Sequence, residues 1–137
     1  MGRILALDYG TKRVGIAVTD PLKIIASSLD TIHPNDIVKY ISKYLTKESV
    51  ELIVVGLPVQ MNGQPSESEV HIKPFIKKLA ENFPVIPIVR YDERFTSKMA
   101  FSSLIEGGYK KKDRQDKKRL DSISATLILQ GYLLSTQ

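Results

Sequence analysis

Hydrophobic and polar positions alternate along the first third of the chain, which predicts three consecutive β-strands. The first segment, residues 3–8, carries aliphatic side chains on both of its faces, as a strand does when it is buried on two sides. A turn over residues 10–13 separates it from a second alternating segment, residues 14–19, so the two segments are expected to form a β-hairpin. Residues 24–32 predict the third strand.

The hydrophobic period changes after the third strand. Residues 34–47 place apolar side chains at helical spacing, and residues 52–56 form a short continuous apolar segment that is typical of a buried parallel strand. A second helix is expected over residues 66–82, because Ser66 and Glu69 have the spacing of a capping box.

The rest of the chain predicts one more strand and two more helices. Residues 85–91 form the strand, and its prolines indicate an edge position. Residues 97–106 predict a helix that two glycines end, and residues 120–134 predict the last helix, while residues 57–65 are expected to form a loop. An antiparallel meander followed by βα crossovers gives a mixed five-stranded sheet flanked by helices. We therefore predict an α/β fold with a single domain over residues 1–137.

The positive charge of the chain is concentrated in one segment, residues 110–119. The net charge is +5, and this segment holds seven of the 20 basic residues and two of the 15 acids, so the remaining chain is neutral. A solvated loop would explain such a segment, but a basic loop on a neutral body also fits a protein that binds phosphate backbones. The basic residues are Lys110, Lys111, Lys112, Arg114, Lys117, Lys118 and Arg119.

The composition also excludes several classes of site. The chain has no cysteine, so disulfides, thiolate zinc sites and a cysteine nucleophile are excluded. Asp8 interrupts the first apolar segment too early for a signal-peptide core, and no stretch approaches the roughly 20 apolar residues of a membrane span. We expect a cytoplasmic protein without membrane association.

Acidic residues lie at the ends of two predicted strands. Asp8 ends the first strand on the face of Ile4 and Ala6, where a carboxylate must be paired, hydrogen-bonded or bound to a metal. Capping of the following turn is the alternative. The acidic pair Asp92-Glu93 follows residues 85–91, at the end of a strand where open α/β sheets bind ligands. A surface ion pair with the next residue, Arg94, is the alternative there.

A third acid, Asp121, falls in the first turn of the last predicted helix. The helix dipole favours an acid at this place, yet helical spacing also puts Asp121 on the face of Ala125 and Ile128, which is expected to face the body of the domain. Hard oxygen ligands without cysteine select Mg²⁺ or Mn²⁺. Two such ions can cleave a phosphodiester bond, because one activates water and the other stabilises the leaving oxygen.

Four motifs resemble, in the same order, those of the YqgF-type nucleases, an RNase H-like family also described as Holliday junction resolvases. The motifs are DYGTKRVGIA at 8–17, VGLP at 55–58 with Asn62-Gly63, DERFTS at 92–97 and LDSISA at 120–125. The resemblance covers nearly the whole chain, and its departures, Phe95 and Ser124, alter no carboxylate.

The resemblance implies an RNase H-like fold and a divalent-metal-dependent nuclease. It also implies that Asp8, Glu93 and Asp121 form the metal-binding catalytic triad. The implied activity is trimming of the leading (5′) end of precursor 16S ribosomal RNA, with ribosomal precursor particles as partners. Cleavage of Holliday junctions in DNA recombination and repair is the alternative activity.

Basic residues near the triad are expected to bind the nucleic acid. Lys12 and Arg13 follow Asp8 in the predicted turn and could meet a phosphate of the bound strand. Arg94 could do the same, or could orient Glu93.

The basic segment has its own predicted role in the choice of partner. Residues 110–119 lead into the last helix just before Asp121, so their positive charge is expected to lie beside the predicted ions. This charge favours a nucleic acid, structured RNA or branched DNA, as the partner.

The oligomeric state depends on the activity. A junction-cutting enzyme is expected to be a symmetric dimer, whereas an enzyme that trims RNA can be a monomer. The sequence leaves both states open.

Two other classes of function compete with a nuclease. Residues 8–11, followed by a hairpin, also resemble the phosphate loop of actin-like ATPases, but those proteins close two such domains around a nucleotide and this chain supplies one. The other alternative is a noncatalytic module that binds RNA or a ribosomal partner on the same fold. Intact acids argue against that module.

Overall fold

A single mixed sheet forms the centre of the structure, a computed structural model that describes residues 2–57, 69–92 and 117–136, with only the backbone described for 117–122. The order of the strands in the sheet is β3-β2-β1-β4-β5. β2 runs antiparallel to both β1 and β3, whereas β4 runs parallel to both β1 and β5. The strands are β1 (Arg3–Tyr9), β2 (Val14–Thr19), β3 (Ala26–Ile32), β4 (Val50–Leu57) and β5 (Ile88–Asp92). The predicted meander followed by parallel crossovers is confirmed.

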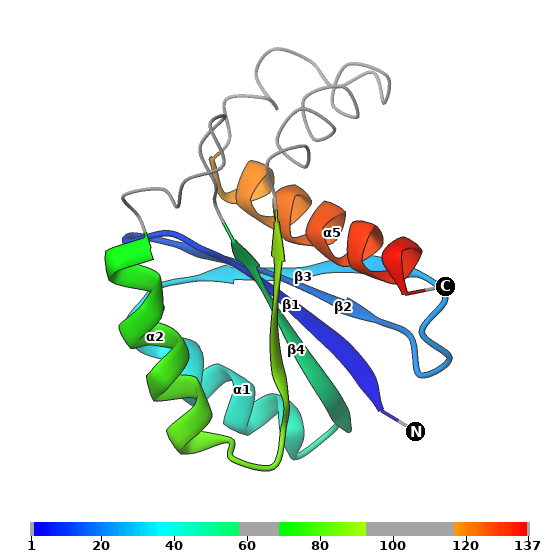
Figure 1. Ribbon diagram of the computed structural model, residues 1–137, viewed down its shortest axis with the longest axis horizontal. Helices are drawn as coiled ribbons and strands as arrows, with labels where there is room; N and C mark the ends of the chain where they lie inside the picture. The colour runs from blue at the N-terminus through cyan, green and yellow to red at the C-terminus, as the bar shows by residue number, and fades with distance from the viewer. Residues whose placement is uncertain (1, 58–68, 93–116, 137) are drawn as a thin grey trace.

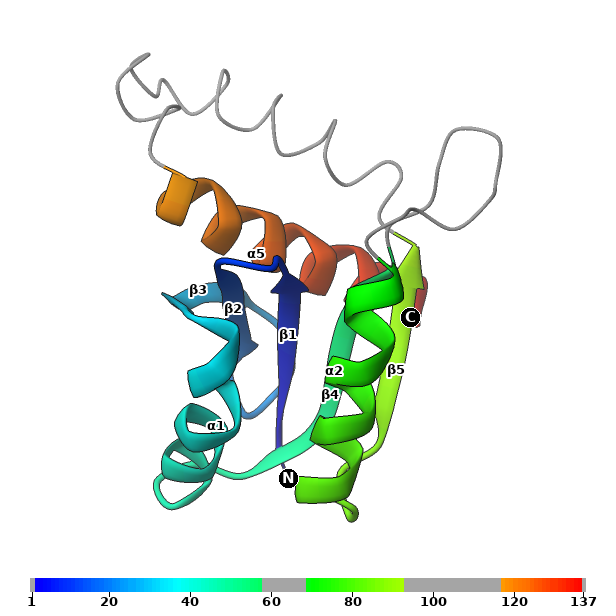
Figure 2. The same ribbon diagram turned by 90° about the vertical axis from the view of Figure 1, so that its left-hand side faces the viewer.

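Helices cover both faces of this sheet. A short 3-10 helix, η1 (Pro34–Asp36), leads into α1 (Ile37–Leu45), and α2 (Glu69–Asn82) lies on the same face as α1, whereas α5 (Lys117–Ser135) crosses the opposite face (Figures 1 and 2). No helix in the described part of the chain is both long and apolar enough to cross a membrane.

The central strand β1 supplies residues to two separate hydrophobic cores. Leu5 and Leu7 pack on the face of α1 and α2, and Ile4 and Ala6 pack on the face of α5. Full burial of a leucine or isoleucine side chain contributes about 1.5–3 kcal/mol to folding. The helices complete the first core with Ile37, Ile41, Ile72, Phe75 and Leu79, and the second with Ala125, Ile128 and Leu129.

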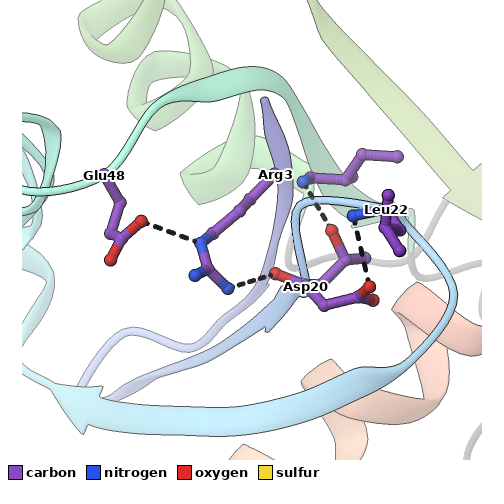
Figure 3. A network of polar contacts seen from close by, with 6 residues as sticks. Arg3, Asp20, Leu22 and Glu48 are labelled. Atoms are coloured by element: carbon purple, nitrogen blue, oxygen red, sulfur yellow. Dashed lines mark hydrogen bonds and ion pairs between the residues drawn. The ribbon is translucent and has the colours of Figure 1, made fainter. Parts of the chain in front are cut away.

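The turn between β2 and β3 is held by one carboxylate. Oδ1 of Asp20 accepts hydrogen bonds from the amides of Ile24 and Ile25, both at 2.8 Å. Oδ2 accepts one from the Leu22 amide at 3.2 Å (Figure 3). Because these amides are engaged locally, the strand begins at Ala26 and not at Ile24, as the alternation of side chains predicted. The side-chain pattern did not reveal this competition for backbone donors.

The edge position predicted for the last strand is confirmed, but the strand begins at Ile88 and not at Val85. The preceding residues form a turn in which the Ile86 amide donates to the Phe83 carbonyl at 3.1 Å. Pro87 then has no amide hydrogen to offer to a neighbouring strand.

The last helix begins earlier than predicted. It starts at Lys117 and not near Leu120, so the final three basic residues of the charged segment are helical. Lysine and arginine are good helix formers, and nothing in the sequence marks a cap at Leu120. Asp121 is therefore the fifth residue of α5 and lies beyond the first turn, where the helix dipole would have explained an acid.

Several predicted features lie outside the described residues. Of the loop predicted over residues 57–65, only Leu57 is described, and it ends β4. The helix predicted over residues 97–106 and the Ser66 half of the capping box also lie outside the description. The predicted end of the second helix at Asn82 is confirmed.

A glycine lets α5 lie close to the edge strand. A Cβ atom built on Gly131 would lie 2.8 Å from Cζ of Tyr91 and closer still to the tyrosine hydroxyl. Tyr91 packs against the core on the α5 face. The missing side chain at Gly131 therefore makes room for the tyrosine ring.

We expect Gly131→Ala to destabilise the protein by about 1–3 kcal/mol, because the new methyl group overpacks the contact with Tyr91. In an unconstrained helix the same change would stabilise by about 1 kcal/mol. Urea unfolding measures the difference, and the loss should shrink when Tyr91→Leu is already present. A more stable single variant would show that the contact is loose.

The Asp20 turn should also make folding sensitive to acid. Hydrogen bonds from backbone amides, the Ile25 amide foremost, lower the pKa of the Asp20 carboxyl below its ordinary value of 3.8, although desolvation opposes them. A lowered pKa in the folded state contributes stability above the unfolded-state pKa, and this contribution is lost as the pH falls through the folded-state pKa.

Asp20→Asn should therefore lower the melting temperature by a constant amount above about pH 5, where the wild-type carboxylate is charged in both states. The difference between the two proteins should begin to shrink as the pH falls below 3.8. It should close once the pH falls below the lower folded-state pKa of Asp20, because the wild-type carboxyl is then also neutral in the folded protein. Thermal unfolding across this pH range measures it. A difference that persists undiminished at low pH would mean that the charge of Asp20 is unimportant.

Candidate functional site

Three strands end at the same edge of the sheet. β1, β4 and β5 run parallel, and the register pairs Leu7 with Val55 and Val55 with Arg90. The carboxyl ends of the three strands therefore lie side by side, and Figure 2 shows all three pointing the same way. Two acids lie at the ends of the outer two strands: Asp8 is next to last in β1, and Asp92 is last in β5. This is the edge at which the sequence predicted a site.

Asp8 lies next to last in β1 on the face covered by α5. Its side chain is half-buried, and it continues the alternation that puts Ile4 and Ala6 into the α5 core. Its partner across the antiparallel ladder is Gly15 of β2. On the other side, Gly56 follows Val55 in β4, at the level of Asp8. Both neighbouring strands thus place a residue without a side chain beside this carboxylate.

The turn that follows β1 carries the next two predicted residues. Lys12 is exposed and Arg13 is half-buried, and both lie between β1 and β2 at the end of the sheet that carries Asp8. The turn is tight at its start, because a Cβ atom on Gly10 would lie 2.7 Å from the Arg13 carbonyl oxygen. A residue larger than glycine would have to displace that carbonyl.

The backbone of α5 brings Asp121 to the side of the helix that faces the sheet. Ala125 and Ile128 follow it by four and seven residues, and both are buried in the α5 core. Residues at this spacing share one face of a helix. Both views place the start of α5 on the side of the molecule where β1, β4 and β5 end (Figures 1 and 2).

Most of the other predicted residues cannot be placed. Glu93, Arg94, Lys110, Lys111, Lys112 and Arg114 lie outside the described residues, and Lys117, Lys118 and Arg119 are placed only by their backbone in α5. Among the side chains that the structure describes, no three metal-binding groups gather in one place. The convergence of the three acids therefore stays a prediction.

The structure adds one charged pair that the sequence reading missed. Arg90 of β5 donates to both carboxylate oxygens of Glu69, the first residue of α2, at 2.5 and 3.3 Å. The same guanidinium donates to the main-chain carbonyls of Gly56 at 2.9 Å and Val55 at 3.3 Å. Glu69 is 6% exposed. The available signal was an arginine between Val89 and Tyr91 in a predicted strand, because a cation that is partly buried there must find a partner.

A family model and individual relatives match nearly the whole length of this chain. A protein-family model described as "RuvX: Holliday junction resolvase" matches residues 2–135. A protein of Christiangramia forsetii is 56% identical over 133 residues, which cover 97% of this chain and 98% of the relative. One of Parabacteroides distasonis is 52% identical over 135 residues, which cover 98% and 96%. Both relatives carry the name "Putative pre-16S rRNA nuclease".

Among solved structures, the chain is similar to Thermus thermophilus RuvC in complex with a Holliday junction substrate. The TM-score is 0.58 at 14% sequence identity, and the match covers 99% of this chain and 96% of that one. At this identity the likeness concerns the fold, and it confirms the predicted RNase H-like architecture.

Proposed function

The chain belongs to the RuvX family of Holliday junction resolvases and is a nuclease, and we propose that it trims the 5′ end of precursor 16S ribosomal RNA with bound divalent cations. The observation that carries the choice of RNA is the name of relatives that are 50–56% identical over nearly their whole lengths. Asp8, at the carboxyl end of the central strand, carries the choice of metal chemistry.

The donor chemistry of the site fits Mg²⁺ or Mn²⁺. We assign Asp8, Glu93 and Asp121 as the ligands, and carboxylate oxygens are what these cations prefer. A pair of such ions would supply an activated water and neutralise the charge that develops on the leaving oxygen.

The described geometry supports this assignment at each element. β1 presents Asp8 beside two glycines, and α5 carries Asp121 on its sheet-facing side. Glu93 follows Asp92, the last residue of β5, in the sequence. Asp8 and the start of α5 lie at one end of the sheet, and β5 ends there just before Glu93, which supports assigning the three acids to one site.

Basic residues would hold the substrate strand. Lys12 and Arg13 lie in the turn just beyond Asp8, where a phosphate next to the cleaved bond would pass. Arg94 follows Glu93, so it is assigned either to a phosphate or to the orientation of that acid. Residues 110–119 carry seven positive charges and lead into α5, so they would add contacts to the phosphate backbone.

Cleavage of four-way DNA junctions is the second candidate. The family description and the RuvC-like fold favour it, since RuvC was solved with that substrate. A resolvase must cut two strands of a symmetric junction and is expected to act as a dimer, whereas trimming of one RNA end needs a single site. Product mapping on both substrates, together with a solution mass, separates the two activities.

Asp8→Asn should abolish metal-dependent cleavage while the protein stays folded. Loss of one anionic ligand is expected to lower the cleavage rate by about 100-fold or more, because several kcal/mol of transition-state stabilisation depend on the ions. The measurement is cleavage of a precursor 16S RNA fragment in Mg²⁺ or Mn²⁺, with and without chelator. Asp30→Asn is the matched control, because Asp30 is an exposed acid in edge strand β3.

Two outcomes would contradict the proposal. Cleavage that continues in excess chelator would rule out bound divalent cations. Cleavage by folded Asp8→Asn at the rate of Asp30→Asn would remove Asp8 from the site.

Replacing Lys110, Lys111 and Lys112 with alanine should weaken nucleic-acid binding and flatten its dependence on salt. Each lost phosphate contact reduces the slope of log K against log salt by about 0.7 for a single strand, so three contacts reduce it by roughly 2. Fluorescence anisotropy with a labelled RNA in chelator measures the slope. The matched control removes the same charge from the exposed lysines of α2, Lys73, Lys77 and Lys78. Equal slopes for both triple variants would mean that residues 110–112 are only solvated.

A further inference from the structure

The Arg90 guanidinium joins three elements at the end of the sheet where β1, β4 and β5 finish, which is the end that carries Asp8. Its own strand, β5, is an edge strand, and β4 is its neighbour in the sheet. The side chain lies on the α2 face and donates to Glu69 as well as to the carbonyls of Val55 and Gly56. One planar cation therefore links the end of β4, the start of α2 and the end of β5.

These links lie within two residues of the proposed site. Gly56, whose carbonyl accepts from Arg90, sits at the level of Asp8 on the strand next to β1. Asp92 follows Arg90 by two residues and precedes Glu93. A change in the position of β5 relative to β4 would thus alter the separation between Asp8 and the acid that follows β5.

The chemistry of arginine is specific to this task. The guanidinium spreads its donors over a rigid plane, so Nε and both terminal nitrogens each reach a different acceptor here. A lysine ammonium could still pair with the Glu69 carboxylate, but as a compact charge it could not also span the two β4 carbonyls. Arg90→Lys therefore keeps the positive charge but removes the planar set of donors that reaches both β4 carbonyls.

We propose that Arg90 is a positioning residue of the nuclease, which holds β4 and β5 at the spacing that the metal-binding carboxylates require. This inference rests on the proposed function of the same edge. Arg90 acts through the strands and contacts neither the substrate nor the ions.

The opposite end of the sheet offers a matched control, Arg3 (Figure 3). Arg3 lies in β1 and, like Arg90, has a side chain that is 24% exposed. It likewise bonds a glutamate, Glu48 at 3.1 Å, and a main-chain carbonyl, that of Thr19 at 3.0 Å. Because Arg3 begins β1 and Asp8 lies near its end, Arg3→Lys removes a similar tie far from the site.

The experiment compares Arg90→Lys, Glu69→Gln and Arg3→Lys in the full chain. Mn²⁺ binding is measured by calorimetry without nucleic acid, and kcat and KM for an RNA fragment are measured across Mn²⁺ concentrations. We expect Arg90→Lys to weaken Mn²⁺ binding and to lower kcat by about tenfold, as for other residues that support metal ligands, with KM for RNA unchanged. Glu69→Gln should act in the same direction, whereas Arg3→Lys should leave both quantities within about twofold of wild type.

Thermal unfolding distinguishes positioning from stability. If Arg90→Lys and Arg3→Lys lose activity in proportion to their melting temperatures, or if Arg90→Lys binds Mn²⁺ and cleaves like wild type, the inference is overturned while the proposed function stands. If Arg90→Lys weakens Mn²⁺ binding relative to wild type, but wild type cleaves neither RNA nor a DNA junction, the proposed function fails and the positioning role is retained.

Discussion

Burial of β1 on both of its faces is the constraint on which the rest of the structure depends. Successive side chains of a strand point to opposite faces, so Leu5 and Leu7 require cover on one side and Ile4 and Ala6 on the other. The chain meets this requirement with α1 and α2 on one face and α5 on the other. A polar side chain is tolerated only where the cover ends, and Asp8 lies there.

An arginine connects neighbouring elements at each end of this sheet, but only one of the two arginines lies near the proposed site. At the amino end of β1, Arg3 ties the strand to Glu48 and to the last carbonyl of β2. At the carboxyl end of β5, Arg90 ties the sheet to α2. Each half-buried arginine bonds a carboxylate and at least one backbone carbonyl, so it connects several elements with one side chain. Only the second tie lies at the edge where catalysis is proposed.

Most of the fold could be predicted from the sequence because local patterns and global burial agree in it. Residues 3–8 carry apolar side chains on both faces, and β4 is continuously apolar. Both patterns predict a strand that is covered on both faces. The errors fell at the ends of elements. Asp20 captured amides that a strand would have used, and the helical propensity of Lys117 and its neighbours extended α5. The bonds of Asp20 depend on side-chain geometry, to which residue patterns are insensitive, and the exact ends of helices are weakly marked in any sequence.

For the candidate site, the sequence by itself determined the residue types and their order: an acid ending the first strand, an acid after the last strand, and an acid early in the last helix. It determined this because strand ends and helix faces follow from periodicity. Only the tertiary structure decided which residues stand beside Asp8, since Gly15 and Gly56 come from two other strands in register. It also decided that Arg90 meets Glu69 across 21 positions of the chain, because a long-range contact is set by packing between elements and not by local sequence.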